Sequence, residues 1–85
     1  MGTQQLKTRY QYINFIPIEG KPEHTTLKFD CYNNHHDTYL GAVAWYAPWR
    51  QYCFMPSTLA GLVFNRTCLA DIQDFLQQLM NDRRK

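Results

Sequence analysis

The sequence predicts an α+β fold, in which a four-stranded antiparallel sheet is followed by one C-terminal amphipathic helix packed on one face. Three observations support this prediction. Four segments ahead of residue 57 are rich in β-branched and aromatic residues, which favour strands. Polar or Gly- and Pro-containing stretches of hairpin length separate these segments. Beyond them the apolar residues recur at spacings of three and four, which is the period of a helix.

The first predicted strand spans 7–18 and is rich in tyrosine and isoleucine. Pro17, near its end, indicates an edge strand or a strand terminus, because proline cannot donate a ladder hydrogen bond. An exposed edge of this kind is also able to pair with a second copy of the chain. The stretch 19–22 contains the Gly20 and Pro22 expected of a turn.

The second predicted strand, 25–32, shows the clearest alternation of the chain. Its apolar and more polar residues follow one another in the order Leu27, Lys28, Phe29, Asp30, Cys31 and Tyr32. One face should therefore be apolar and the other largely solvated. The polar stretch 33–37 is the expected hairpin connection to the next strand.

The third and fourth strands are predicted at 39–46 and 49–55, joined by a turn at Ala47 and Pro48. The third strand carries small side chains at Ala42 and Ala44. Small residues let a helix pack close to a sheet, so we expect these alanines on the side that the helix covers.

The helix is predicted from Cys68 to Asp82, with Thr67 as its N-cap or Asn65 if it begins slightly earlier. Its apolar stripe consists of Leu69, Ile72, Phe75, Leu76, Leu79 and Met80. The predicted core joins the helix to the second strand and consists of Leu27, Phe29, Leu69, Ile72, Phe75, Leu76 and Leu79.

Length and charge predict one small domain over 1–85, with a frayed start at 1–6 and a basic tail at 83–85. The formal net charge is +2, and three of the nine basic residues lie in that tail. The charge is therefore too small to attract a polyanion by itself. The chain opens without a signal-like segment and holds no apolar run of bilayer length, so we expect a cytoplasmic protein without a membrane partner.

Aromatic residues are concentrated between positions 45 and 54, around a single arginine. A strand directs alternate side chains to opposite faces, so some of these rings should stay exposed and form a binding surface. The predicted partner-binding residues are Trp45, Tyr46, Trp49, Arg50 and Tyr52. An alternative is that Arg50 stacks on a neighbouring ring and only stabilises the hairpin.

The same region resembles small uncharacterised accessory proteins of temperate phages and prophages. The matching residues are Leu40-Gly41, Trp45-Tyr46, the run Trp49 to Phe54, Pro56, Val63-Phe64, Cys68-Leu69, Asp71-Ile72 and Phe75-Leu76. The resemblance extends from Leu40 to Met80 and implies a phage-related protein that works inside a bacterial host. It implies no activity, substrate or catalytic residue.

Metal binding and catalysis are weakly supported by the sequence. A zinc site at Cys31, His35 and His36, completed by Cys53, lacks the second pair of closely spaced ligands that structural zinc sites use. Cys68, at a helix start, is a better candidate nucleophile than Cys53, but its apolar neighbours indicate burial. We therefore expect no enzyme, no metal and no cofactor.

The predicted function is that of a small protein-interaction module, whose partner is a host or phage protein or a second copy in a homodimer. Interfaces are enriched in Trp, Tyr and Arg. The alternative is single-stranded nucleic acid, which would stack on exposed rings beside cations. A sheet face that shows Arg9, Lys28 and Arg50 beside exposed rings would favour nucleic acid. An apolar patch without lysine would favour protein.

Overall fold

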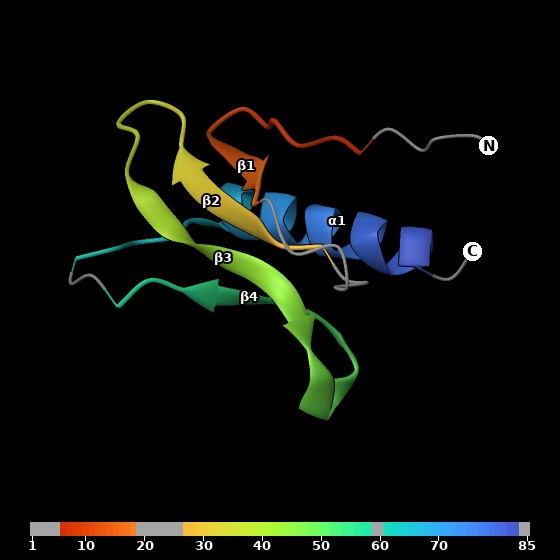
Figure 1. Cartoon of the computed structure of the whole chain (residues 1–85). Helices are drawn as coiled ribbons and strands as arrows, with labels where there is room; N and C mark the ends of the chain where they lie inside the picture. Colours follow the sequence, from red (N-terminus) through yellow and green to blue (C-terminus); the bar gives the residue numbers. More distant parts are fainter. Residues whose placement is uncertain (1–5, 19–26, 59–60, 84–85) are drawn as a thin grey trace.

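A computed structural model describes residues 6–18, 27–58 and 61–83, and it confirms the α+β fold. The elements are β1 (Ile13–Pro17), β2 (Phe29–Asn33), β3 (Tyr39–Tyr46), the 3₁₀ helix η1 (Ala47–Trp49), β4 (Gln51–Pro56) and α1 (Arg66–Arg83). The four strands form one antiparallel sheet in the order β1-β2-β3-β4. The helix lies behind this sheet, across one of its faces (Figure 1).

The predicted first strand is shorter than expected because its N-terminal half folds back on it. The Tyr10 N–H donates to the Ile13 carbonyl at 2.8 Å and closes a tight turn. Beyond the turn, Arg9 bridges to Asn14, and the Phe15 N–H donates to the Thr8 carbonyl at 2.8 Å. β1 therefore lies at a sheet edge, as Pro17 predicted, but residues 8–9 run alongside it. The other predicted strands are confirmed within a few residues, apart from Thr25 and Thr26, which lie outside the described residues.

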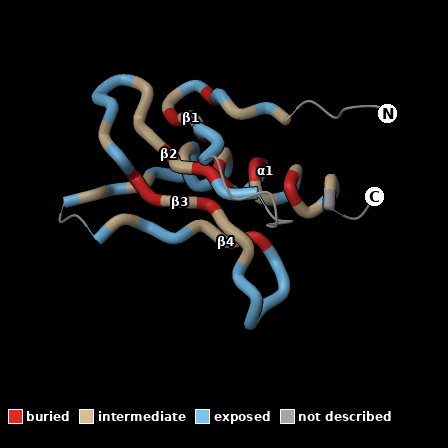
Figure 2. The backbone as a smooth tube through the Cα atoms, viewed as in Figure 1, coloured by how far each residue is buried: buried red, intermediate tan, exposed pale blue. Residues whose placement is uncertain are grey.

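The core lies between the sheet and α1. The Phe75 ring stacks on the Phe15 ring at a centroid distance of 4.0 Å and meets the Phe29 ring edge-on at 4.8 Å. Buried hydrophobic residues come from all four strands, from three positions of the helix and from Tyr10 ahead of β1 (Figure 2). They are Tyr10, Ile13, Phe15, Phe29, Cys31, Leu40, Val43, Tyr52, Ile72, Phe75 and Leu79.

Two of the predicted core residues are exposed. Leu27 is 45% exposed and precedes β2, so it is not part of the buried face. Leu69 is 53% exposed because it falls in the first turn of α1, beside rather than under the stripe that Ile72 and Phe75 bury. Leu76 is half-buried against the core, whereas Phe29, Ile72, Phe75 and Leu79 are buried as predicted.

The alanines of β3 lie on the opposite face from the one predicted. Directly opposed residues of an antiparallel pair share a face, and Ala42 is opposite Asp30 and Met55, whereas the buried Val43 is opposite Phe29 and Phe54. The register shifts between Cys31 and Tyr32, which leaves Leu40 as an extra residue on β3. This bulge lets Leu40 join the core next to Gly41, which simple alternation does not predict.

A glycine provides the close packing that the alanines were expected to provide. A β-carbon at Gly41 would lie 2.5 Å from the Met55 carbonyl oxygen and 2.7 Å from the Phe54 ring. Only a hydrogen fits there, so Phe54 packs over the glycine on the helix side of the sheet.

α1 begins two residues earlier than predicted. The Asn65 side-chain oxygen accepts the Cys68 N–H at 2.8 Å, which is the N-cap bond of a helix that starts at Arg66. Polar contacts also join the helix to the N-terminal segment. The Tyr10 hydroxyl donates to Asp74 at 2.7 Å, and Gln78 exchanges hydrogen bonds with the Lys7 backbone at 2.9 and 3.0 Å.

Candidate binding surface

The tip of the β3–β4 hairpin is held in one conformation by its own backbone. Pro48 fits the first turn of η1, where its missing N–H would have no partner. The turn closes at Arg50, whose N–H donates to the Tyr46 carbonyl at 2.9 Å and to the Ala47 carbonyl at 3.1 Å. Arg50 has a φ of 55° and a ψ of 48°, the left-handed conformation that glycine and asparagine adopt most readily.

Tyr46, Trp49 and Arg50 form an exposed group at this turn, which we call the tip. The Tyr46 and Trp49 rings meet edge-to-face at a centroid distance of 5.0 Å. Trp49 is 66% exposed, which makes it the most exposed aromatic residue of the described ranges. The tip projects beyond the end of the sheet (Figure 1). A large apolar ring and a guanidinium are thus both accessible on a rigid turn.

The other two predicted partner-binding residues lie on the opposite side of the sheet. Trp45 and Tyr52 are directly opposed across β3 and β4, and their rings meet at 5.4 Å on the helix side. Tyr52 is buried, and its hydroxyl accepts the Leu27 N–H at 3.1 Å. Trp45 is half-buried against the core. The structure therefore separates the five residues into three at the tip and two that pack with the core.

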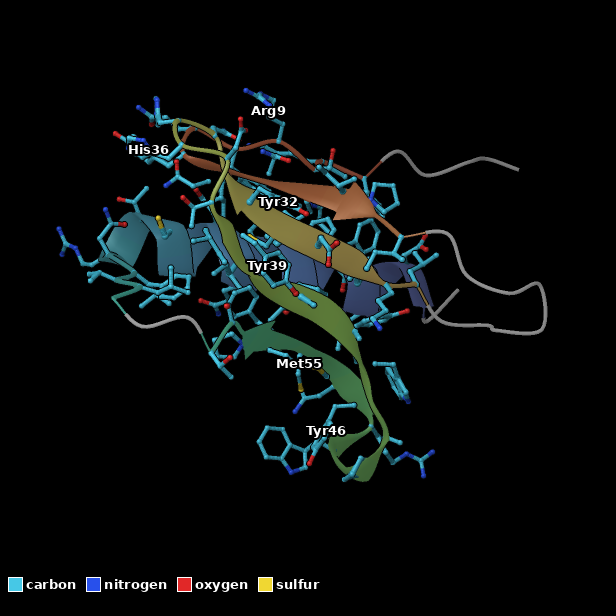
Figure 3. All side chains as sticks on the ribbon, turned by 60° about the vertical axis from the view of Figure 1, so that its left-hand side comes forward. Arg9, Tyr32, His36, Tyr39, Tyr46 and Met55 are labelled. Atoms are coloured by element: carbon cyan, nitrogen blue, oxygen red, sulfur yellow. The ribbon has the colours of Figure 1, made fainter. Side chains whose placement is uncertain are left out.

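The sheet face turned away from α1, which we call the open face, carries a second set of rings. Tyr32 and Tyr39 are directly opposed on β2 and β3, with ring centroids 5.6 Å apart. Figure 3 shows these two tyrosines, Tyr46 and Met55 on this face, and no described helix covers it. Sequence reasoning missed Tyr32 and Tyr39 as surface candidates. The alternation of Tyr32 with the buried Cys31 places Tyr32 on the solvated side, whereas Tyr39 reaches this face only because of the bulge at Leu40.

Charges on the open face are mixed. Lys28 and Asp30 both alternate with the buried Phe29, so they project to this side. Arg9 is opposite Asn14, which is itself opposite Tyr32, so Arg9 lies at the outer margin of the same face. Desolvation, followed by the charge of Asp30 and the nearby Tyr32 and Cys31, raises the pKa of Tyr39. Two cations therefore flank a face with a carboxylate near its middle.

Lys7 makes a cation–π contact with Tyr10, and its Nζ lies 4.6 Å from the Tyr10 ring centroid. The burial of Tyr10 and its hydrogen bond to Asp74 raise the pKa of its hydroxyl.

The candidate zinc ligands are not brought together. Cys31 is fully buried between the sheet and the helix, whereas His35 and His36 lie exposed in the β2–β3 loop, where their backbone N–H groups donate to the Asn33 side chain. Within residues 6–18, 27–58 and 61–83, no three His, Cys, Asp or Glu side chains form a group suited to a metal ion. Burial, followed by the nearby Cys68, raises the pKa of the Cys31 thiol to about 12.

Cys53 and Cys68 are half-buried free thiols. The Cys53 thiol donates weakly to the Gln51 carbonyl, and the Cys68 N–H donates to the Asn65 side chain that caps the helix. A membrane-crossing helix is absent from the described ranges, because α1 does not combine its length with sufficient apolar composition.

The fold and surface thus define a small α+β protein with an exposed aromatic hairpin tip and one sheet face that no described helix covers. The chain is similar to an uncharacterised 9.3 kDa protein of Acholeplasma phage L2, with 28% identity over 75 residues. That similarity covers 88% of this chain and 92% of the phage protein. No protein-family model and no solved structure matches the chain. Its similarity is therefore to a phage protein of unknown function.

Proposed function

We propose that this protein is a non-enzymatic phage accessory protein that binds a host or phage protein through the tip formed by Tyr46, Trp49 and Arg50. The observation that carries this proposal is the combination of a 66% exposed Trp49 with an arginine in the left-handed conformation next to it. A non-glycine residue in that conformation costs about 1–2 kcal/mol. Strain of this kind concentrates at functional positions, which supports a role for the Arg50 side chain beyond the turn itself.

The composition of the tip matches that of energetic centres in protein interfaces. Trp, Tyr and Arg are the residue types that dominate such centres, and lysine is depleted from them. The tip contains all three types, and neither lysine nor an acidic residue lies between Tyr46 and Pro56. Because the turn is already hydrogen-bonded through Arg50, little conformational entropy is lost when a partner binds.

The test compares the partners captured by the tagged wild type and by a Trp49→Ala, Arg50→Gly variant. Glycine is preferred at position 50, so this variant keeps the turn while it removes the ring and the guanidinium. The matched control is Tyr39→Ala, which removes an exposed ring at the other end of β3. We expect a protein that the wild type and the control capture and that the tip variant loses. Equal capture by all three folded proteins would refute the proposed site.

Single-stranded nucleic acid is the second candidate, and one observation favours it. Lys28 and Arg9 lie on the same face as Tyr32 and Tyr39. Two of the three cations expected beside the rings of a nucleic-acid surface are therefore on this face. Asp30 on the same face argues against nucleic acid, because binding to phosphates requires surrounding basic residues. Titration with oligo(dT) and oligo(U) at low and high salt separates the two functions. Salt-sensitive binding that Tyr39→Ala weakens and the tip variant retains would establish nucleic acid as the ligand.

A further inference from the structure

The two edges of the sheet differ in their capacity to pair. On the outer edge of β1, the Phe15 N–H donates to the Thr8 carbonyl, and the Ile13 carbonyl accepts the Tyr10 N–H. Pro17, the next outward residue, has no N–H. In an edge strand, the backbone N–H and C=O groups of every second residue point away from the sheet. Because the groups just named are already bonded or missing, β1 has few left to pair with an incoming strand.

The outer edge of β4 is open. The Ser57 N–H donates to the Leu40 carbonyl at 2.9 Å, which fixes the alternation along the strand. Met55, Cys53 and Gln51 therefore direct their backbone groups to β3, whereas Tyr52 and Phe54 direct theirs outward. β4 is the last strand of the sheet, and within the described ranges no backbone group pairs with these outward groups (Figure 1).

β4 also lacks the features by which proteins protect an edge strand. Its sequence, Gln-Tyr-Cys-Phe-Met-Pro, contains no charged residue, and its only interruption is the terminal Pro56. Natural edges are usually blocked by lysine, an internal proline, a bulge or a covering segment. An uncharged edge with two free N–H groups is a template for another strand.

We infer that β4 pairs with β4 of a second copy of this chain, antiparallel about a two-fold axis at Cys53, so that the two sheets join into one. In this register the Tyr52 N–H and carbonyl bond to Phe54 of the second copy, and by symmetry Phe54 bonds to Tyr52 of the second copy. Both outward residues of each strand are then fully paired.

The ends of β4 exclude the neighbouring registers. If the two β4 strands slide so that Tyr52 lies opposite Pro56 of the second copy, the Tyr52 carbonyl has no N–H to accept, because proline lacks one. The opposite shift places Phe54 against Arg50, whose N–H already bonds to Tyr46 and Ala47 and whose backbone is left-handed. Only the Cys53-centred register satisfies all the outward groups of Tyr52 and Phe54.

Side chains are compatible in this register, which is why the occupant is a second copy rather than an unrelated strand. Across the new ladder, Tyr52 is opposite Phe54 on the helix side, and aromatic cross-strand pairs are favourable. Gln51 is opposite Met55 on the open face, so no like charges meet. The pairing ends before Arg50, which leaves the tip of each copy accessible.

Cysteine cross-linking tests the register. Directly opposed residues that are not hydrogen-bonded to each other have Cα atoms about 4.5 Å apart, which lies within the disulfide range. In a Cys68→Ser background, diamide accepts the two electrons and two protons of the paired Cys53 thiols as their S–S bond forms. We expect a covalent dimer that Cys53→Ser abolishes.

Cysteines at a second pair of positions distinguish pairing in this register from cross-links that form by random collision. In the Cys53→Ser, Cys68→Ser background, a Gln51→Cys, Met55→Cys protein should form a dimer, because these positions face each other across the axis. Gln51→Cys alone should not, because its two copies lie about 13 Å apart along the strand, four residues at about 3.3 Å each. Equal cross-linking of both proteins would overturn the register.

Sedimentation equilibrium tests the association without cross-links. We expect a concentration-dependent dimer for the wild type and for Ile16→Lys, which introduces a charge on the open-face side of the opposite edge strand. Cys53→Lys places two like charges at the axis and should weaken dimerisation at least tenfold, with unchanged circular dichroism. A wild type that stays monomeric up to millimolar concentration, with rapid amide exchange at Tyr52 and Phe54, would overturn the inference.

Discussion

Gly41 lies in β3 at a position where β4 leaves no room for a β-carbon. A β-carbon there would meet the Met55 carbonyl oxygen at 2.5 Å, and that oxygen belongs to the backbone of the neighbouring strand. The strand has to shift to accommodate it. Gly41→Ala should therefore lower the free energy of unfolding by about 1–3 kcal/mol, the usual cost of overpacking.

Urea denaturation measures this change, with Ala42→Ser as the control, because Ala42 lies on the open face next to Gly41. A surface substitution of this type should stay within about 0.5 kcal/mol. If Gly41→Ala is as stable as the control, the close packing of Phe54 over the glycine is not required by the fold.

Cys31 makes stability depend on pH at the alkaline end. Burial raises its pKa from the ordinary value of 9.0 to about 12, so the folded state favours the neutral thiol. Below pH 9 the thiol is neutral in both states, and its contribution is fully present. Between pH 9 and 12 only the unfolded chain ionises, so the free energy of unfolding falls, by at most about 1.4 kcal/mol per pH unit.

Urea unfolding at pH 8 and pH 10.5 measures this loss, and Cys31→Ala should show a smaller one. The raised pKa of Tyr10 acts in the same direction in both proteins, so it does not affect the comparison. Equal losses in the two proteins would mean that the Cys31 thiol ionises as readily when folded as when unfolded.

At the scale of elements, the helix face is tested by two neighbouring apolar residues with opposite environments. Ile72 is 4% exposed and packs in the core, whereas Leu69 is 53% exposed in the first turn. Ile72→Ala should cost about 2–5 kcal/mol, and Leu69→Ala should cost less than about 0.5 kcal/mol. Thermal and urea unfolding of both variants give the comparison. Similar losses would mean that the first turn is packed more tightly than the structure shows.

The elements themselves were largely predictable because each follows from a local signal. Alternation identified β2, a composition that favours strands identified the other strands, and spacings of three and four identified α1. The errors occurred where a non-local contact decides. The fold-back at Tyr10 depends on hydrogen bonds to Ile13 and on the docking of Tyr10 on Asp74. The bulge at Leu40 depends on the β2 register, which the sequence of β3 alone does not contain.

At the scale of the whole molecule, the aromatic concentration was predictable but its division was not. The parity of a strand places Tyr46 and Trp45 on opposite faces, and only the position of α1 determines which of them is covered. This alternation does not apply to Trp49, because Trp49 lies in η1 and not in a strand. The three residues of the tip are therefore among those that the sequence predicted for partner binding, whereas Trp45 and Tyr52 pack with the core.

We propose that the partner contacts the tip and not the core side of the hairpin. Trp49 and Trp45 are the two tryptophans of the chain, one at the tip and one half-buried on the helix side. Fluorine NMR of 5-fluorotryptophan-labelled protein therefore gives one signal from each environment, assigned with Trp49→Phe. On addition of bacterial lysate, or of the captured partner, the Trp49 signal should shift while the Trp45 signal keeps its frequency. Unchanged signals, or a shift of Trp45 alone, would contradict the claim.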